Sequence, residues 1–158
     1  MLNKGISSIR VNSMNDNVNI LNEYMSNIKV ETNNLYNLHF NVIGMSFMGL
    51  HKKLQEYYEN FNLFYYNIAE RIKMLNGFPI TSLPKIEEIS TIKSMKSMDF
   101  SANQVFSILD NDFAYLTEYT KDLIKVFQEK KDYYTDHILT NILIYLEKEL
   151  WMIKSSLK

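Results

Sequence analysis

The chain has 158 residues, and 46% of them are hydrophobic while only four are glycine and two are proline. Such a length and composition predict one folded, mainly helical domain that can bury a sizeable core. Seventeen basic and eighteen acidic residues give a net charge of −1, and the absence of cysteine excludes a disulfide scaffold, thiol catalysis and cysteine-ligated zinc.

The N-terminal stretch MLNKGISSIRVNSMNDN is polar and lacks the apolar segment of a signal peptide. No apolar run in the sequence approaches the roughly 18 residues that a membrane span needs, so a cytoplasmic protein without a membrane segment is expected. Residues 1–15 are interpreted as a flexible N-terminal arm whose only cations are Lys4 and Arg10. Because affinity for DNA rises with the number of phosphates neutralised, weak or absent DNA binding is expected.

Helical periodicity begins after this arm. The first long helix is expected to start after Asn15 or Asp16, either of which can act as the N-cap, and to end before Gly44. The second covers about Phe47–Asn76, with Gly77 as the C′ residue that ends it. Each helix has apolar residues at helical spacing and is therefore predicted to bury one face.

A short helix and two further long helices are expected in the rest of the chain. Residues 81–90, with the pattern SLPKIEEIS, indicate a helix too short to be stable without a neighbour. Ser101 and Gln104 form a capping box that opens the third long helix, whose apolar side is interrupted by Asp112. The fourth covers about residues 132–156. These elements predict an all-α four-helix bundle with a crossover connection that carries the short helix.

Two of the three histidines flank a glycine-containing turn. His39 and His51 are twelve residues apart, and on one unbroken helix they would point about 120° apart and share no ligand. Gly44 and Gly49 supply a turn signal between them. His39 is therefore expected near the end of one helix, and His51 near the start of the next.

Four polar side chains share one stripe of the second long helix: His51, Gln55, Tyr66 and Glu70. His51 and Glu70 are separated by roughly 28 Å along that helix, so one copy cannot bring both to a single ion. Two copies packed antiparallel about a two-fold axis near Asn60 would place His51 beside Glu70 of the partner subunit. The spacing thus predicts an intersubunit site, two per dimer.

The ordered motifs of the chain resemble the Dps family of miniferritins over about residues 17–157. They are LHFNV, the glycine-containing turn, LHKKLQEYYENF, NIAERI, GFPITSL, EEISTI and LEKELWMIKSSL. In that family, two histidines of one subunit and an aspartate and a glutamate of its two-fold mate form a ferroxidase site. The resemblance implies that His39 and His51 are the histidines and Glu70 the glutamate, with Tyr66 at the aspartate position.

The same resemblance implies a ferritin-like Dps domain over residues 16–158, assembled from two-fold dimers into a homododecamer that handles iron. Hydrogen peroxide would be the favoured oxidant. Gln55 falls at a secondary acidic position, and Phe40 replaces the family's tryptophan. Asp132 and Asp136 fall where an acidic three-fold pore would admit cations, although N-capping of the last helix is the alternative interpretation.

Two other kinds of metal centre are not expected. Internal di-iron bundles carry Glu-x-x-His on each of two helices, and none of the three histidines follows a glutamate at that spacing. His137, on the last helix, falls at none of the ligand positions that the spacing defines. The nine methionines are interpreted as core residues rather than as haem ligands, so iron is expected without haem.

Tyr66 leaves two functions open. A phenol is neutral at pH 7, because its unperturbed pKa is about 10, so Fe(II) should bind less tightly than to a site with the aspartate. The first hypothesis is a weakened ferroxidase that oxidises Fe(II), stores ferric iron and protects against oxidative stress. The alternative is a shell with a degenerate site that acts in passive metal binding or as a structural or DNA-associated protein. Tyr66 is then either a phenolate ligand of Fe(III) or an aromatic side chain that fills the dimer contact.

Overall fold

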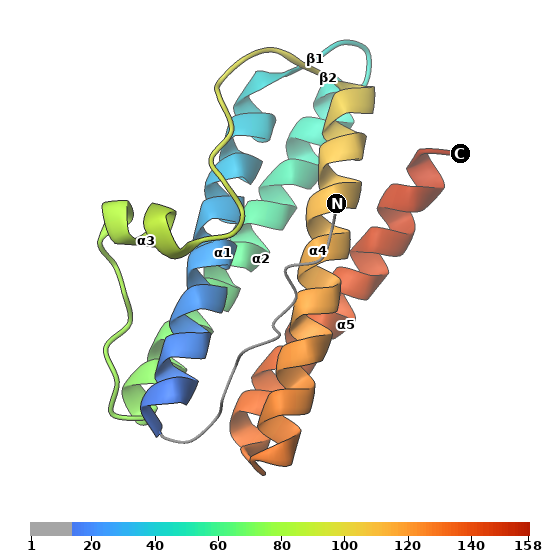
Figure 1. The fold of residues 1–158 in the computed structure, drawn as a ribbon. Helices are drawn as coiled ribbons and strands as arrows, with labels where there is room; N and C mark the ends of the chain where they lie inside the picture. The colour runs from blue at the N-terminus through green and yellow to red at the C-terminus, as the bar shows by residue number, and fades with distance from the viewer. Residues whose placement is uncertain (1–13) are drawn as a thin grey trace.

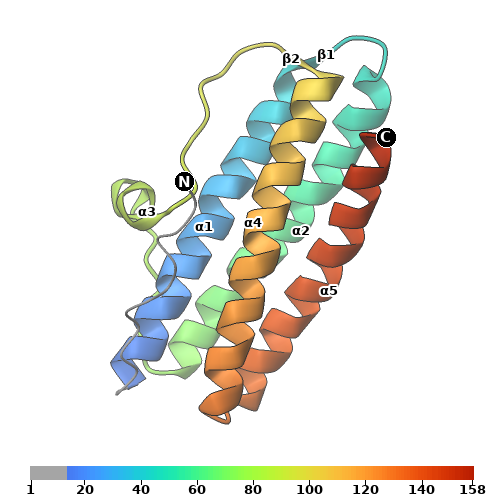
Figure 2. The ribbon, with the colours of Figure 1, turned by 45° about the vertical axis from the view of Figure 1, so that its right-hand side comes forward.

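The computed structural model describes residues 14–158, so residues 1–13 of the predicted arm lie outside the described part of the chain. Four long helices form a bundle (Figures 1 and 2), and the predicted all-α architecture is confirmed. They are α1 (Met14–Asn41), α2 (Phe47–Met74), α4 (Ala102–Glu129) and α5 (Tyr133–Ser156). None of the helices in residues 14–158 is long and apolar enough to cross a membrane.

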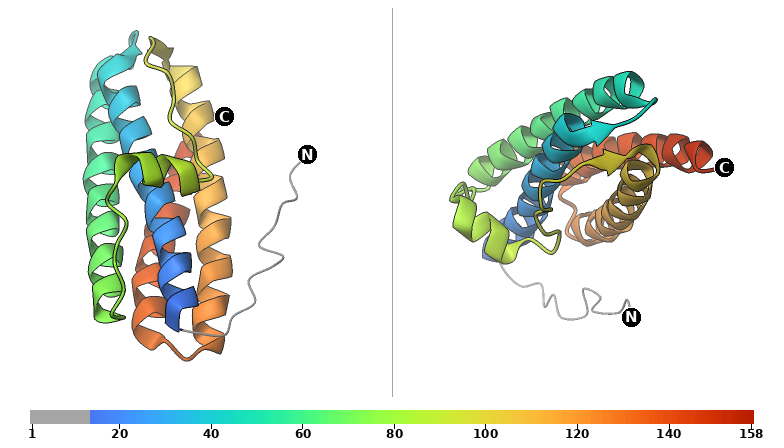
Figure 3. Two further views of the ribbon diagram at one scale, coloured as in Figure 1. Left: turned by 60° about the vertical axis from the view of Figure 1, so that its left-hand side comes forward. Right: turned by 90° about the horizontal axis from the view of Figure 1, so that it is seen from above.

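The direction of the helices explains the long connection in the middle of the chain. Helices α2 and α4 run in the same direction, so the chain must return the full length of the bundle between them (Figure 1). The short helix α3 (Leu83–Ile89) lies in this crossover and packs on the outside of α1 (Figure 3). At the far end, β1 (Val42–Ile43) pairs in parallel with β2 (Phe100–Ser101). This two-residue ladder was not predicted, because it is too short to show a period of two.

The core is made by large side chains from α1, α2 and α4, packed against leucines and isoleucines of all four long helices. The largest side chains that are fully buried are Tyr24, Phe61, Phe113 and Phe127. The hydroxyl groups of Tyr24 and Thr120 lie 2.6 Å apart and satisfy each other. A buried phenol is therefore hydrogen-bonded rather than left unpaired, as the cost of burying a polar group requires.

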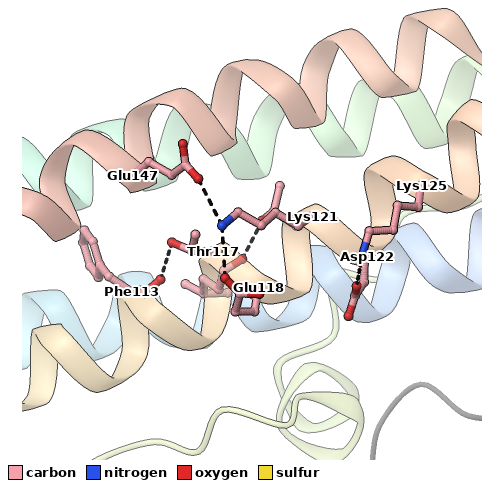
Figure 4. Close-up of polar contacts among 9 residues, drawn as sticks. Phe113, Thr117, Glu118, Lys121, Asp122, Lys125 and Glu147 are labelled. Carbon is pink, nitrogen blue, oxygen red and sulfur yellow. Dashed lines mark hydrogen bonds and ion pairs between the residues drawn. The ribbon is translucent and has the colours of Figure 1, made fainter.

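Ion pairs on the surface of α4 and α5 add little to this packing. Lys121 lies 3.1 Å from both Glu118 and Glu147, and Lys125 lies 3.0 Å from Asp122 (Figure 4). These side chains are largely exposed. Exposed pairs of this kind contribute about 0 to 1 kcal/mol each. The α4–α5 hairpin is therefore held by its apolar contacts.

The helix ends follow the sequence signals with two corrections. Helix α1 already includes Met14, so Asn15 and Asp16, the expected N-caps, lie inside it. Ser101 and Gln104 form the predicted capping box in both directions. At the end of α2, however, the residue in the left-handed region is Asn76, with φ of 59°, and not Gly77. The amide of Gly77 donates to the carbonyl of Ile72 at 2.9 Å, so Gly77 comes one position after the C′ residue. A Cβ atom on Gly77 would lie 2.6 Å from a methyl group of Val18, so glycine is required there for close packing.

Four asparagines of α1, which we call the asparagine row, hold the crossover in place: Asn22, Asn27, Asn34 and Asn37. Their side-chain amides bond to backbone groups of residues 78 and 80, 91 and 92, 93 and 95, and 95 and 96 respectively, at 2.8 to 3.2 Å. The crossover has no sheet or long helix of its own to satisfy these groups, and buried backbone groups need partners. Side chains of α1 supply them.

We expect Asn27→Ala to lower the free energy of unfolding by about 2 to 3 kcal/mol, because two crossover amides would lose their acceptor. The side-chain oxygen of Asn27 accepts from the backbone N–H of Thr91 at 3.0 Å and of Ile92 at 2.9 Å. Urea denaturation measures the change, and Asn33→Ala on the exposed side of α1 is the matched control. Equal stability of the two variants would contradict this role of the asparagine row.

Candidate metal centre

His39 and His51 face each other across the glycine-containing turn, as expected for the end of α1 and the start of α2. Their rings are stacked with centroids 3.7 Å apart and planes inclined by 21°. The Nδ1 atom of His39 lies 2.7 Å from the backbone carbonyl oxygen of His51, and the Nδ1 atom of His51 lies 2.8 Å from that of His39. Because a carbonyl oxygen only accepts, each Nδ1 carries the proton and donates.

This reciprocal pair of bonds, which we call the histidine clasp, fixes the chemistry of both rings. In a neutral imidazole with its proton on Nδ1, the lone pair is on Nε2, which is then free to bind a metal. Metal-binding histidines commonly donate their other N–H to a carbonyl in this way. The clasp therefore presents two imidazole ligands from one subunit with the tautomer already set.

Aromatic side chains shelter the histidine clasp. His39 is only 5% exposed. Phe47 stacks on His51 with ring centroids 5.0 Å apart, while Phe40 and Tyr58 meet His39 edge-on at 5.0 and 5.2 Å. Burial lowers the pKa of His39, the neighbouring His51 ring lowers it further, and the bond to the carbonyl of His51 opposes both. The net effect favours the neutral imidazole, which is the form that binds a metal.

The other predicted ligands lie on the exposed stripe of α2, with Gln55 one turn after His51 and with Tyr66 and Glu70 farther along the helix. Gln55 donates to the carboxylate of Glu59 at 2.8 Å. Tyr66 is 57% exposed, and a hydrogen bond to Glu70, together with the charge of that carboxylate, raises the pKa of Tyr66. In the single subunit the raised pKa opposes the phenolate form. Tyr66 and Glu70 are therefore hydrogen-bonded neighbours on α2.

Arg71, which follows Glu70 on α2, is paired with residues of α5 and its N-cap rather than with Glu70. Its guanidinium bonds to the carboxylate of Asp132 and to the hydroxyl of Thr135, both at 2.9 Å. The guanidinium also lies over the ring of Tyr134, 4.9 Å from its centroid. Within residues 14–158, no ion pair joins Arg71 to Glu70, and the carboxylate of Glu70 stays at an exposed position.

A single subunit does not complete a metal site at the clasp. Within residues 14–158, no three histidine, aspartate or glutamate side chains come together in a way that could hold a metal ion. His51 and Glu70 are on one continuous helix, where nineteen residues correspond to about 28 Å. Any carboxylate that joins the clasp from the α2 stripe must therefore come from a second chain.

The predicted pore residues have partners within the subunit. Asp132 is the N-cap of α5, where its side chain accepts from the amide of Thr135, and it is also paired with Arg71. Asp136 accepts from the amide of Gln128 at 3.3 Å and from Thr140 at 3.2 Å. The N-capping alternative thus describes Asp132 in the subunit. A role of either residue in a pore stays a prediction.

We expect Asp132→Asn to be less stable than the parent chain at pH 7 by about 1 kcal/mol, with the difference disappearing at low pH. Burial alone would raise the pKa of Asp132, but its bonds to Thr135 and Arg71 outweigh this and lower it. The stability that a lowered pKa provides is present above the ordinary value near 4 and is lost as pH falls through the lowered pKa. Asparagine keeps the cap but not the charge. Urea unfolding at pH 7 and pH 3 measures both differences, and a gap that persists unchanged at pH 3 would contradict the assignment.

Sequence reasoning missed one pair of acids altogether. Glu31 of α1 is fully buried and lies beside Asp112 of α4. A signal was present, because Glu31 sits between Ile28 and Leu35 on the buried side of α1, just as Asp112 interrupts the apolar side of its own helix. The two acids lie on different helices, and the periodicity of a single helix does not show which residues of another helix it meets.

Comparisons with known proteins agree with this fold. The family model described as a ferritin-like domain matches residues 18–158. The DNA protection during starvation protein of Brevibacillus brevis is 33% identical over 139 residues, which cover 88% of this chain and 93% of that protein. The chain is thus a ferritin-like helical bundle protein.

Solved structures narrow the class further. The crystal structure of Dps from Staphylococcus aureus matches with a TM-score of 0.88 and 28% identity, covering 94% of this chain and 99% of that one. A Dps protein from Vibrio cholerae O1, described as a member of a broad superfamily of ferritin-like diiron-carboxylate proteins, matches with a TM-score of 0.88 and 26% identity over 92% of this chain and 91% of that one. The chain belongs to the Dps family.

Proposed function

We propose that this protein is a miniferritin subunit that binds Fe(II) between two chains related by a two-fold axis, oxidises it, and stores ferric iron inside a dodecamer. The histidine clasp is the observation that carries the proposal. It offers two Nε2 ligands from His39 and His51, and Glu70 of the partner subunit adds a carboxylate. Fe(II) accepts this combination of imidazole and carboxylate.

The exposed face around α2 supports the pairing of subunits. Large apolar side chains remain exposed on α2 and on the segment that follows it: Phe47, Met48, Leu63, Tyr66, Met74, Phe78 and Leu83. Isolated exposed apolar residues are normal, but this many along one helix and its continuation indicate an interaction surface. Antiparallel contact of two α2 helices would cover part of this surface and place each clasp beside the α2 stripe of the other chain.

The stoichiometry of the proposed iron oxidation follows from the balance of electrons. Hydrogen peroxide takes up two electrons and two protons to become two waters, and each Fe(II) supplies one electron, so two Fe(II) are oxidised for each peroxide. The residues of this chain bind the iron, keep the histidines neutral and exclude bulk water from His39. Tyr66 offers no carboxylate for a second iron, so oxidation should be slower than with aspartate at that position.

A second candidate function is supported by Tyr66 itself. Its hydrogen bond to Glu70 engages the one carboxylate that the site needs. A shell in which Glu70 stays hydrogen-bonded to Tyr66 would hold cations passively and oxidise little iron. An iron-soaked crystal separates the two candidates, because the ferroxidase gives an anomalous peak between His51 and Glu70 of the partner subunit, whereas the passive shell gives none there. DNA association has less support, because the chain's net charge is −1.

We expect His39→Ala to reduce the rate of Fe(II) oxidation by hydrogen peroxide at least tenfold, because loss of one of three ligands weakens iron binding. Stopped-flow absorbance of the ferric product measures the rate. His137→Ala is the matched control, since His137 is exposed on α5 and contacts Asn141. A parent rate equal to that of buffer, unchanged in His39→Ala, would rule out the ferroxidase.

We expect Tyr66→Asp to increase the oxidation rate several-fold, because aspartate restores an ionised ligand in place of a neutral phenol. Tyr66→Phe keeps the ring and removes the hydroxyl that bonds to Glu70, so it tests the alternative that the tyrosine fills the contact. If Tyr66→Phe oxidises iron at the parent rate, the tyrosine serves as an aromatic side chain that fills the dimer contact. If the oxidation rate falls, the tyrosine acts as a phenolate ligand. An Asp variant no faster than the parent would contradict the explanation from the missing carboxylate.

A further inference from the structure

We propose that Glu31 and Asp112 bind a hard divalent cation, such as Mn²⁺ or Ca²⁺, which enters through the pocket between α1, α4 and the crossover. This site is separate from the histidine clasp and does not depend on the proposed iron chemistry. It rests on three observations: a fully buried carboxylate with no cationic partner, a second carboxyl group that contacts it, and an oxygen-rich pocket that is lined by this second group.

The Glu31 carboxylate is the most unusual polar group of the core. It is 0% exposed, and within the described part of the chain neither of its oxygens has a hydrogen-bond partner of good geometry. Its polar partners are Asp112 and Asn34, which lie close enough to share a hydrogen bond with it although neither contact meets strict geometry. Burying an ionised carboxylate without a partner costs several kcal/mol, and a second carboxylate beside it increases the cost. The pair is therefore stable only if a proton or a cation offsets one of the two charges.

Within residues 14–158, no ammonium or guanidinium group is paired with these two carboxyl groups. Among the residues that line the adjoining pocket, Lys93 is the one cationic side chain, and its ammonium donates to the backbone carbonyls of Glu87 at 2.9 Å and Ser90 at 2.6 Å. Burial raises the pKa of Glu31 well above its usual range, and the charge of Asp112 raises it further. A proton or a metal ion must therefore compensate the charge at neutral pH.

The pocket has the size and the ligands for a metal ion. Its volume is about 470 Å³, and its lining includes Asn34, Thr91, Asn111, Asp112 and Tyr115. Asn111, Thr91 and Tyr115 are exposed at the mouth, Asp112 is half-buried, and Glu31, which contacts Asp112, is fully buried behind it. Asp112 is thus accessible from solvent through the pocket, and a cation bound there would meet the Glu31 carboxylate that contacts it.

The donor atoms select the class of cation. Carboxylate, amide and hydroxyl oxygens are hard ligands that suit Ca²⁺, Mg²⁺ and Mn²⁺, whereas no histidine or methionine sulfur lies among the proposed ligands. The amide oxygen of Asn34 already accepts from the backbone of Met95 at 2.9 Å. The hydroxyls of Thr91 and Tyr115 lie 2.6 Å apart across the mouth. We therefore assign the two carboxylates as the charged ligands and Asn111 as the neutral oxygen nearest to Asp112 in the chain.

A bound cation would join three separate segments, because Glu31 is on α1, Asp112 is on α4, and Thr91 lies in the crossover. The expected result is a more stable fold at neutral pH. A ligand that binds only the folded chain stabilises it by mass action, and a hundredfold excess over Kd raises the melting temperature of a chain of this size by about 5 °C or more.

The test uses the assembled protein carrying His39→Ala, stripped with a chelator, at pH 7.5, so that the clasp does not contribute. Mn²⁺ is titrated by calorimetry, and bound Mn²⁺ is counted by electron paramagnetic resonance. We expect one site per subunit, an upward shift of the melting temperature, and an affinity at least tenfold lower in Glu31→Gln and in Asp112→Asn. Glu118→Gln, an exposed acid on α4, is the matched control and should bind as the parent does.

Glu31→Leu keeps the proposal testable if the amide variants are unstable. Leucine fills the core without a charge, so this variant should be at least as stable as the metal-free parent and should not respond to Mn²⁺. Absence of a Mn²⁺ site in the His39→Ala background, or an affinity unchanged by both amide substitutions, would overturn the proposal and leave a proton as the compensating charge. Either result is independent of whether the parent protein oxidises iron.

Discussion

Two hydrogen bonds between the end of α1 and the start of α2 determine what the candidate metal centre can do. Each histidine of the clasp donates to the other's backbone carbonyl, so the turn between them also fixes both tautomers. A substitution that shifts the turn would therefore change the ligands even if both histidines remained. Phe47, Phe40 and Tyr58 then limit the water around the rings. The geometry of the turn thus determines which nitrogen atom of each histidine is able to bind a metal.

A single subunit forms a complete fold but holds only part of the candidate metal site. Its core is closed and well packed, yet the clasp lacks a carboxylate and the stripe of α2 exposes one at Glu70. Because a straight helix keeps these groups far apart, only another chain can bring them together. Tyr66 stands at the position that decides between the two candidate functions, since it adjoins that carboxylate.

The sequence predicted the elements more reliably than the contacts between them. The four long helices and the capping box at Ser101 depend on local periodicity and local hydrogen bonds, so both were predictable. The end of α2 was misplaced by one residue, because glycine near a helix end can serve either a left-handed turn or close packing, and at Gly77 it serves packing. The contact of Glu31 with Asp112 was not predicted, because the two residues are on different helices. The tautomers of the clasp depend on carbonyl positions that no side-chain pattern encodes.

The asparagine row couples the crossover to α1 more closely than the order of the chain suggests. Backbone groups of the crossover at residues 78, 80, 91–93 and 95 have their partners in side chains of α1, so they lose these bonds wherever α1 unfolds. Segments that share their bonds in this way open and close as one cooperative unit. Although the crossover joins α2 to α4 along the chain, it is energetically an extension of α1.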